Sequence, residues 1–283
     1  IVIAGVNNVM VAELIKNREL VKTETGYSTD AESLAAQIGL IKTIKKYDLK
    51  RMISFHSRVK RAESFSNDIQ NAIKFIDEKD KPSGSLYADF VSGKMDVYKR
   101  RIKIEQLKEP TKGTRSLLSN SRCLSEGVDV PSLDGVAFID PRKSQVDIVQ
   151  AVGRAIRLSD DKKIGTIVLP VFIKGDASAE ASIEASNFKP IWSVLNALKA
   201  HDEVLSYELD QLRTDLGKKK GLGKGSGGIP KVVFDIPTTI DQTFSHSLET
   251  YLVEKTTASW NFWFGLLEVY VEPGRTRGFT RKG

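Results

Sequence analysis

The stretch GVAFIDPRKSQVDIVQAVGRAIRLSD, residues 135–160, contains a strand and a helix in succession. Its first part, GVAFID, is a short apolar run typical of a buried strand, and Pro141 ends this strand because proline has no N–H to donate to a neighbour. From Val146 onward, apolar residues recur at helical spacing, which predicts an amphipathic helix packed on a core. A strand followed by a helix predicts part of a parallel sheet.

The same alternation extends in both directions from this stretch. Further strands are predicted at residues 51–55, 84–90, 114–119 and 165–173, and helices at residues 31–46, 60–76 and 94–108. Because such connections place helices on both faces of a sheet, the predicted fold class is α/β, with a parallel sheet covered on both faces. Ligands of these sheets bind at the carboxyl ends of the strands.

The sequence changes character after Gly175. Residues 187–217 predict one or two helices. The segment GKKKGLGKGSGGIPK, residues 217–231, has five lysines, six glycines and no acid, so it is typical of a flexible linker that could also lie along a phosphate backbone. A short strand is predicted at residues 231–237, and helices are predicted at 244–254 and 257–270. The C-terminal region is therefore expected to be mainly helical.

Composition limits the classes of function. The single cysteine, Cys123, excludes an internal disulfide framework, and with three histidines it gives no metal-ligand spacing, so no metal site is predicted. No apolar run approaches the roughly 20 residues that span a bilayer, and no secretion signal is present at the start, so we expect a cytoplasmic protein without a membrane partner. The net charge of +7 and the pI near 9.3 favour a polyanionic partner.

Two arginines and a glutamine share one face of the helix predicted after Pro141. Gln150, Arg154 and Arg157 are spaced i, i+4 and i+7, and Gly153 lies beside this stripe. Arg154 has no acidic residue three or four positions away. One interpretation is a solvated polar face. The other interpretation is a binding site for an external anion, above all a phosphate chain. The oxygens of a phosphate chain match the paired donors of a guanidinium group.

Several stretches resemble one family. Residues 123–131, CLSEGVDVP, and 150–157, QAVGRAIR, resemble motifs V and VI of superfamily 2 helicases of the DExH type, the latter in the form Q-x-x-G-R-x-x-R. Residues 51–65, RMISFHSRVKRAESF, are similar to motif IV and the helix after it. The tail, residues 259–278, is similar to the helicase-associated repeat of large bacterial DEAH-type helicases.

The resemblance implies the second of two RecA-like lobes, with ATP in the cleft between them. In this family the first lobe carries the P-loop and the acidic motif that holds Mg²⁺. This sequence has no G-x-x-x-x-G-K-[ST] motif and opens at Ile1 rather than methionine. We therefore expect the C-terminal piece of a helicase that binds ATP and Mg²⁺ mainly through a first lobe, and that is inactive by itself.

The resemblance also implies roles for the arginine stripe. Arg157 corresponds to the arginine finger that reaches the γ-phosphate, and Arg154 would stabilise the same developing charge or position the first lobe. Gln150 would hydrogen-bond a phosphate oxygen or the attacking water. These three residues are the predicted catalytic set.

Three further residues are implied on the ATP side. Gly127 would permit a tight turn, and Asp129 would accept hydrogen bonds from the ribose or couple the two sites. Gly153 would let the facing lobe approach the helix backbone closely.

The nucleic acid, DNA or RNA, is expected at another rim of the lobe. The candidate contacts are His56, Ser57, Arg58, Asn120 and Arg122. In the tail, Trp260, Trp263 and Phe264 are interpreted as the packed face of a helix rather than a base-stacking platform.

The predicted division has four parts. The second RecA-like lobe spans residues 1–175, a helical extension 176–216, the linker 217–231, and a helicase-associated helical region 232–283. The predicted function is the second motor lobe of an ATP-dependent helicase or translocase. Two alternatives stay open: a non-catalytic nucleic-acid-binding or interaction module with a helicase-like shape, and the motor part of a restriction enzyme.

Overall fold

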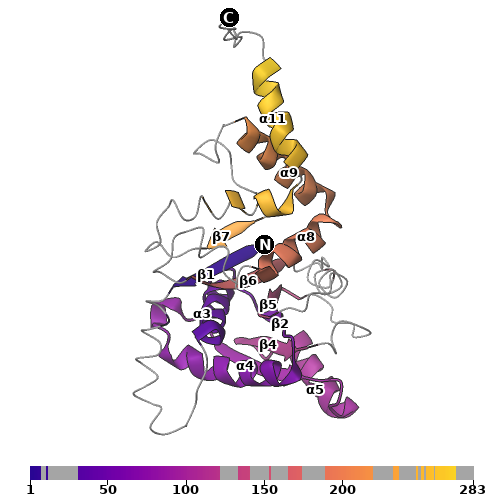
Figure 1. Ribbon diagram of the computed structural model, residues 1–283. Coiled ribbons are helices and arrows are strands. Elements are labelled where there is room, and N and C mark those ends of the chain that lie inside the picture. Colours follow the sequence, from indigo (N-terminus) through magenta and orange to yellow (C-terminus); the bar gives the residue numbers. More distant parts are fainter. Residues whose placement is uncertain are drawn as a thin grey trace, which may run out of the picture.

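The computed structural model contains one parallel sheet between helices, with further helices beyond one edge of the sheet (Figure 1). It describes residues 1–7, 11, 31–121, 133–140, 153, 165–173, 189–218, 232–235, 247, 250–251, 253–257 and 259–271. In this part of the chain, no helix combines the length and the apolar character that crossing a membrane requires.

Seven strands form the described sheet, in the order β3-β4-β2-β5-β6-β1-β7, and all of their pairings are parallel. The strands are β1 (Val2–Asn7), β2 (Arg51–Phe55), β3 (Ser85–Val91), β4 (Thr114–Asn120), β5 (Gly135–Phe138), β6 (Thr166–Ile173) and β7 (Val233–Asp235). The predicted parallel α/β fold is confirmed. β1 was not predicted, because Gly5 interrupts its apolar run and glycine weakens the pattern of a strand.

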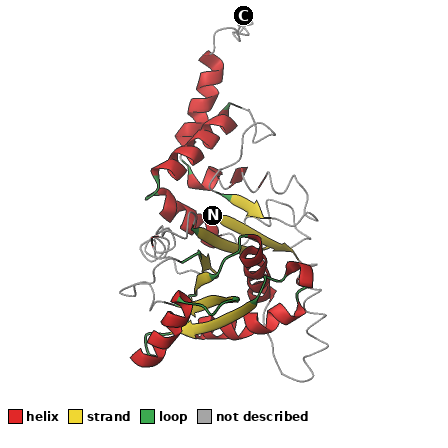
Figure 2. Cartoon of the chain, turned by 180° about the vertical axis from the view of Figure 1, so that it is seen from behind, coloured by secondary structure: helices red, strands yellow, loops and turns green. Residues whose placement is uncertain are grey.

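Helices lie on both faces of the sheet, as predicted (Figure 2). They are α3 (Ala31–Lys46), α4 (Val59–Ala72), α5 (Val97–Lys108), α8 (Lys189–Lys199), α9 (Glu203–Gly217) and α11 (Ser259–Val271), with short 3₁₀ turns at Ile73–Phe75 and Glu78–Asp80. The helix predicted over residues 60–76 therefore ends earlier, at Ala72, and continues as a 3₁₀ turn.

The core consists of two apolar layers, one on each face of the sheet. In β2, Met52 belongs to the layer under α3 and α4, whereas Ile53 belongs to the layer under α5 and α8. Leu117 and Leu118 of β4 divide in the same way. Successive side chains of a strand point to opposite faces, so a sheet buried on both faces requires the continuous apolar runs seen in the sequence.

The chain returns to the sheet after α9. Val233 of β7 donates its N–H to the carbonyl of Ile1 at 2.8 Å, and β7 pairs with β1 at the sheet edge. The predicted division assigned β7 to the C-terminal helical region, residues 232–283. This division stays a prediction, and β7 connects that region to the sheet.

The aromatic face of α11 is exposed rather than packed. Trp260 and Trp263 keep 68% and 62% of their surface accessible, and Phe264 keeps 43%. Their interpretation as a packed face is therefore wrong for the part of the chain that the structure describes. α11 contacts α9 through the opposite side, where Gly265 is buried and has space for no side chain.

We expect Gly265→Ala to separate α11 from α9. An added Cβ would lie 2.0 Å from the carbonyl oxygen of Thr214, a backbone atom that cannot move alone. Overpacking of this kind costs about 1–3 kcal/mol. Thermal unfolding followed by circular dichroism measures the loss. The control is Gly153→Ala, because a Cβ at Gly153 meets nothing within 4 Å. A fall in melting temperature for Gly153→Ala as large as that for Gly265→Ala would contradict the explanation.

Candidate nucleic-acid interface

Polar residues from three neighbouring strands meet at the carboxyl edge of the sheet. Asn120 is the last residue of β4, His56 and Ser57 follow β2, and Asp140 lies two residues beyond β5. Because the three strands are adjacent in the order β4-β2-β5, these residues, which are distant in sequence, come into hydrogen-bonding contact. The edge is the one at which parallel sheets bind their ligands.

The Asp140 carboxylate is the centre of this cluster. It accepts hydrogen bonds from the Ser57 backbone N–H at 3.1 Å and from Ser57 Oγ at 2.5 Å. His56 Nδ1 and Arg61 Nη1 each lie 3.3 Å from its oxygens. Burial raises the pKa of Asp140, but the hydrogen bonds from His56 and Ser57 lower it, and the net pKa lies below the ordinary value for an aspartate.

A buried hydrogen-bond chain continues inward from His56. Its Nε2 lies 3.1 Å from Ser54 Oγ, which lies 2.8 Å from Ser119 Oγ. With Nδ1–H donating to Asp140, Nε2 is the acceptor for the Ser54 hydroxyl, a tautomer that we assign from the network. The imidazole also packs on Phe65, with ring centroids 4.9 Å apart. His56 is therefore held in one orientation.

Asn120 is part of the same buried structure. Its carbonyl accepts the His56 backbone N–H at 2.9 Å, and its side-chain amide donates to the Ser54 carbonyl at 3.2 Å. Its own side-chain oxygen is buried without a partner. Both Asn120 and His56 are at most 2% exposed.

These contacts change how the predicted nucleic-acid residues can act. His56 and Asn120 are buried, and Ser57 directs both of its donors to Asp140. A phosphate contact by Ser57 would have to displace that carboxylate. Arg58, in contrast, is exposed and can reach a ligand in solution. Arg122 lies outside the described residues. The direct contacts of all five candidates stay predictions.

Arg58 begins a strongly basic turn that we call the basic turn, defined by Arg58, Lys60 and Arg61. All three side chains are exposed. Arg58 is the N-cap of α4 in an extended conformation (φ −138°, ψ 151°). No side chain caps this helix start, and the first turn of α4 itself contains no acidic residue. The N-terminal N–H groups of a helix attract anions, and three cations next to them strengthen that potential.

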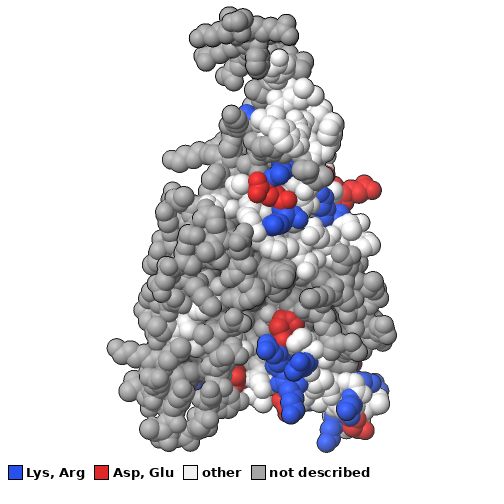
Figure 3. Space-filling view, viewed as in Figure 1, with Lys and Arg blue, Asp and Glu red and all other residues white. Residues whose placement is uncertain are grey.

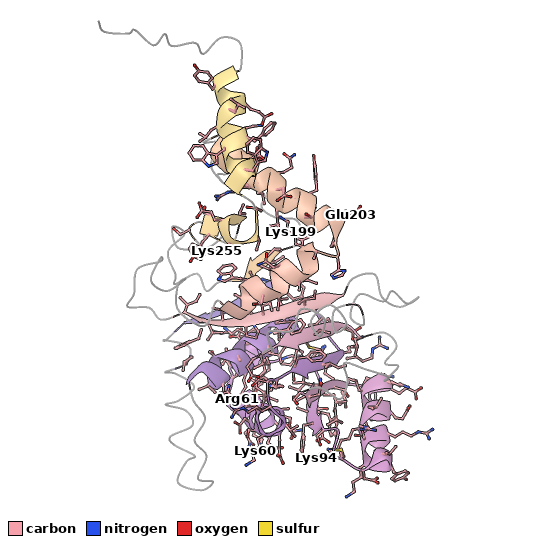
Figure 4. The ribbon with its side chains drawn as sticks, turned by 45° about the vertical axis from the view of Figure 1, so that its right-hand side comes forward. Lys60, Arg61, Lys94, Lys199, Glu203 and Lys255 are labelled. Atoms are coloured by element: carbon pink, nitrogen blue, oxygen red, sulfur yellow. The ribbon has the colours of Figure 1, made fainter. Side chains whose placement is uncertain are left out.

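A further cation, Lys94, follows β3 at the same carboxyl edge and is exposed. Figure 4 labels Lys60, Arg61 and Lys94 in the lower part of the molecule, where α4 and α5 lie, and Figure 3 shows basic side chains over the region of these two helices. Lys60 and Arg61 were not among the predicted site residues, and Asp140 was given no role beyond its place at a strand end. The run SRVKR, with its three cations and no acid, was the available signal for the first two.

The residues predicted to face ATP lie mostly outside the described part of the chain, namely Gln150, Arg154, Arg157, Gly127 and Asp129. Gly153 is described. It lies in a helix, is exposed, and has open space within 4 Å of the position that a Cβ would occupy. That space fits the prediction that another body approaches the backbone there, which stays a prediction.

Comparison with known proteins relates part of the sheet, the strands β2 to β5, to one family. Residues 36–159 match the helicase conserved C-terminal domain. This region is a C-terminal RecA-like lobe of the superfamily 2 helicase type. A helicase-like protein of Sulfolobus islandicus filamentous virus is 35% identical to this chain over 103 residues, which are 36% of this chain and 18% of the viral protein. The probable helicase A859L of African swine fever virus is 29% identical over 139 residues, or 49% of this chain and 15% of that protein. The chain thus spans less than a fifth of either relative.

The fold likeness extends beyond the helicase lobe. Over 91% of this chain, the fold matches the ATP-dependent Type ISP restriction-modification enzyme LlaBIII bound to DNA, with a TM-score of 0.71 and 24% identity. The match covers 17% of that enzyme. The shared fold therefore includes much of the C-terminal region that follows the lobe.

Proposed function

We propose that this chain is the second motor lobe of an ATP-dependent nucleic-acid helicase or translocase. The observation that supports this most directly is the helicase C-terminal domain at residues 36–159, whose sheet presents the basic turn at its carboxyl edge. A first lobe would provide the P-loop and bind Mg²⁺, and would face the arginine stripe.

On the ATP side, the proposal assigns charge stabilisation to the arginine stripe. Bound ATP with Mg²⁺ would supply a γ-phosphoryl group for transfer to water, with ADP as the leaving group. Arg157 would donate to the γ-phosphate oxygens as their charge spreads, and Arg154 would stabilise the same charge. Gln150 would orient a phosphate oxygen or the attacking water. The exposed backbone at Gly153 leaves room for the opposite lobe.

On the nucleic-acid side, the proposal assigns phosphate binding to the basic turn. Arg58 and Lys60 are exposed cations beside the uncapped N-terminus of α4. Contacts of this type bind the phosphate backbone without reading bases, as a motor that moves along any sequence requires. DNA and RNA both present such a backbone.

We expect this chain to bind nucleic acid without sequence preference and with an affinity that falls steeply with salt. Each phosphate neutralised on duplex DNA contributes about −0.9 to the slope of log K against log salt. Lys60→Ala should make this slope shallower by about one such unit. Fluorescence anisotropy of labelled oligonucleotides of two unrelated sequences, at several salt concentrations, measures both quantities.

The matched control is Lys79→Ala. Lys79 is also an exposed lysine, but it lies in the 3₁₀ turn before β3, at the amino edge of the sheet, and pairs with Asp77 at 3.4 Å. Its removal should leave the slope nearly unchanged. Binding that is independent of salt, or equal losses for both lysines, would show that the basic turn is not the phosphate site.

A second candidate function is the translocating motor of a restriction enzyme. It is favoured by the fold match to LlaBIII, which covers 91% of this chain. The two functions differ in their product. A helicase separates the two strands of a duplex. A translocating motor leaves the duplex intact, but it displaces the third strand of a DNA triplex as it moves. Assaying the protein with both lobes on a forked duplex and on a triplex substrate distinguishes them.

A further inference from the structure

We infer that Asp140 is the positioning residue of the basic turn, fixing the conformation in which Arg58 and Lys60 face the nucleic acid. The inference rests on the proposed phosphate binding by that turn. It assigns Asp140 no contact with the ligand. Its action passes through Ser57 and Arg61.

The geometry holds the turn from both sides. Ser57, just before the helix, donates its backbone N–H and its hydroxyl to Asp140 at 3.1 and 2.5 Å. Arg61, in the first turn of α4, is 3.3 Å from the same carboxylate. Arg58 and Lys60 lie between these two anchors, make none of these contacts and are exposed. One carboxylate therefore holds residues on both sides of Arg58 and Lys60.

The anchor itself is rigid. Asp140 lies just beyond β5, and the N–H of Ile139 donates to the Phe55 carbonyl at 3.2 Å, so the strand-end backbones are joined. The His56 side chain is 1% exposed and directs Nδ1 to Asp140. Without this acceptor, the imidazole N–H would be buried and unsatisfied, which favours rearrangement of the turn.

If Asp140 acted only through its charge, replacing it would have the opposite effect on nucleic-acid affinity. A carboxylate beside a phosphate site repels the phosphate, so removing it should strengthen binding. If Asp140 positions the turn, removing it should weaken binding, although the net charge becomes more positive. The sign of the change in affinity therefore separates the two roles.

The experiment measures oligonucleotide affinity by fluorescence anisotropy for the whole chain with Asp140→Ala, Asp140→Asn, Ser57→Ala and the double variant Ser57→Ala/Asp140→Ala. The matched control is Glu63→Gln, which removes an exposed acid on α4 that lies outside the turn. Circular dichroism checks that each variant is folded.

We expect Asp140→Ala to weaken binding about tenfold, and Asp140→Asn to weaken it less, because an amide oxygen still accepts the Ser57 N–H. Glu63→Gln should strengthen binding slightly. In the double variant the losses should not add, because Asp140→Ala already removes the acceptor of the Ser57 hydroxyl. If Asp140→Ala is unfolded, Asp140→Asn decides the matter by the same sign, because it also removes the charge. Ser57→Ala should then weaken binding with no change in charge.

Two outcomes contradict different claims. If the unchanged chain binds nucleic acid but the Asp140 variants bind as tightly or more tightly, Asp140 acts only through its charge and the inference is wrong. If the unchanged chain does not bind at all, the proposed function of the basic turn fails, and the inference fails with it.

Discussion

Replacing Arg157 by alanine is expected to lower the ATP turnover number by about 10³-fold or more in a protein that carries both lobes, because arginine fingers contribute about 10³–10⁵ in other nucleotide hydrolases. The guanidinium would act on charge that develops in the transition state, so the loss should appear in kcat rather than in KM. Nucleic-acid affinity should change little. Steady-state ATPase kinetics measure kcat and KM, and their dependence on the concentration of nucleic acid measures the nucleic-acid affinity.

Two further variants, and the chain without a first lobe, serve as controls for the Arg157→Ala test. Arg157→Lys should restore little activity, because an ammonium cannot reproduce the planar fork of a guanidinium. Ile156→Asp places a charge on the opposite, apolar stripe of the predicted helix and should unfold the lobe. The chain without a first lobe should hydrolyse ATP at background rate. If Arg157→Ala lowers the melting temperature as much as Ile156→Asp does, the arginine is structural and its assignment to the γ-phosphate is wrong.

The second large effect is expected at Arg115, on the amino edge of the sheet. This arginine is 6% exposed. It donates to the Leu49 carbonyl at 2.8 Å, to the Ser83 carbonyl at 2.9 Å and to Asp48 at 2.6 Å, thereby joining the segments that precede β2 and β3 to β4. The Arg115 hydrogen bond lowers the pKa of Asp48. Alanine would leave these carbonyls without their donor.

We expect Arg115→Ala to lower the free energy of unfolding by about 2–4 kcal/mol. For a chain of this size, that corresponds to a fall in melting temperature of about 5–15 °C. Arg115→Lys should recover only part of the loss, since one ammonium cannot reach three separated acceptors. Urea unfolding measures the change. Arg101→Ala, at an exposed position on α5, is the control and should be nearly neutral. Equal effects at both arginines would exclude the proposed bracing role.

The sequence alone determined most of the strand and helix order of the lobe, with β1 as an exception. β2 and α3 occupy the predicted residues, and β3, β4 and β6 differ from their predicted ranges by about one residue. These features depend on local hydrophobic periodicity, which a sequence carries directly. The resemblance to helicases likewise rests on short motifs, and the match over residues 36–159 confirms it.

Only the tertiary structure decided which distant residues meet. Asp140 contacts Ser57 across 83 positions of sequence, and Arg115 contacts Leu49 across 66. β7 joins the far edge of the sheet beside β1, and Gly265 turns the tryptophans of α11 outward. Each of these depends on strand order or on the closest approach of two elements. The hydrophobic periodicity of a single segment predicts neither the strand order nor the approach of two elements. It specifies which face of the segment is apolar, but not which surface will cover that face.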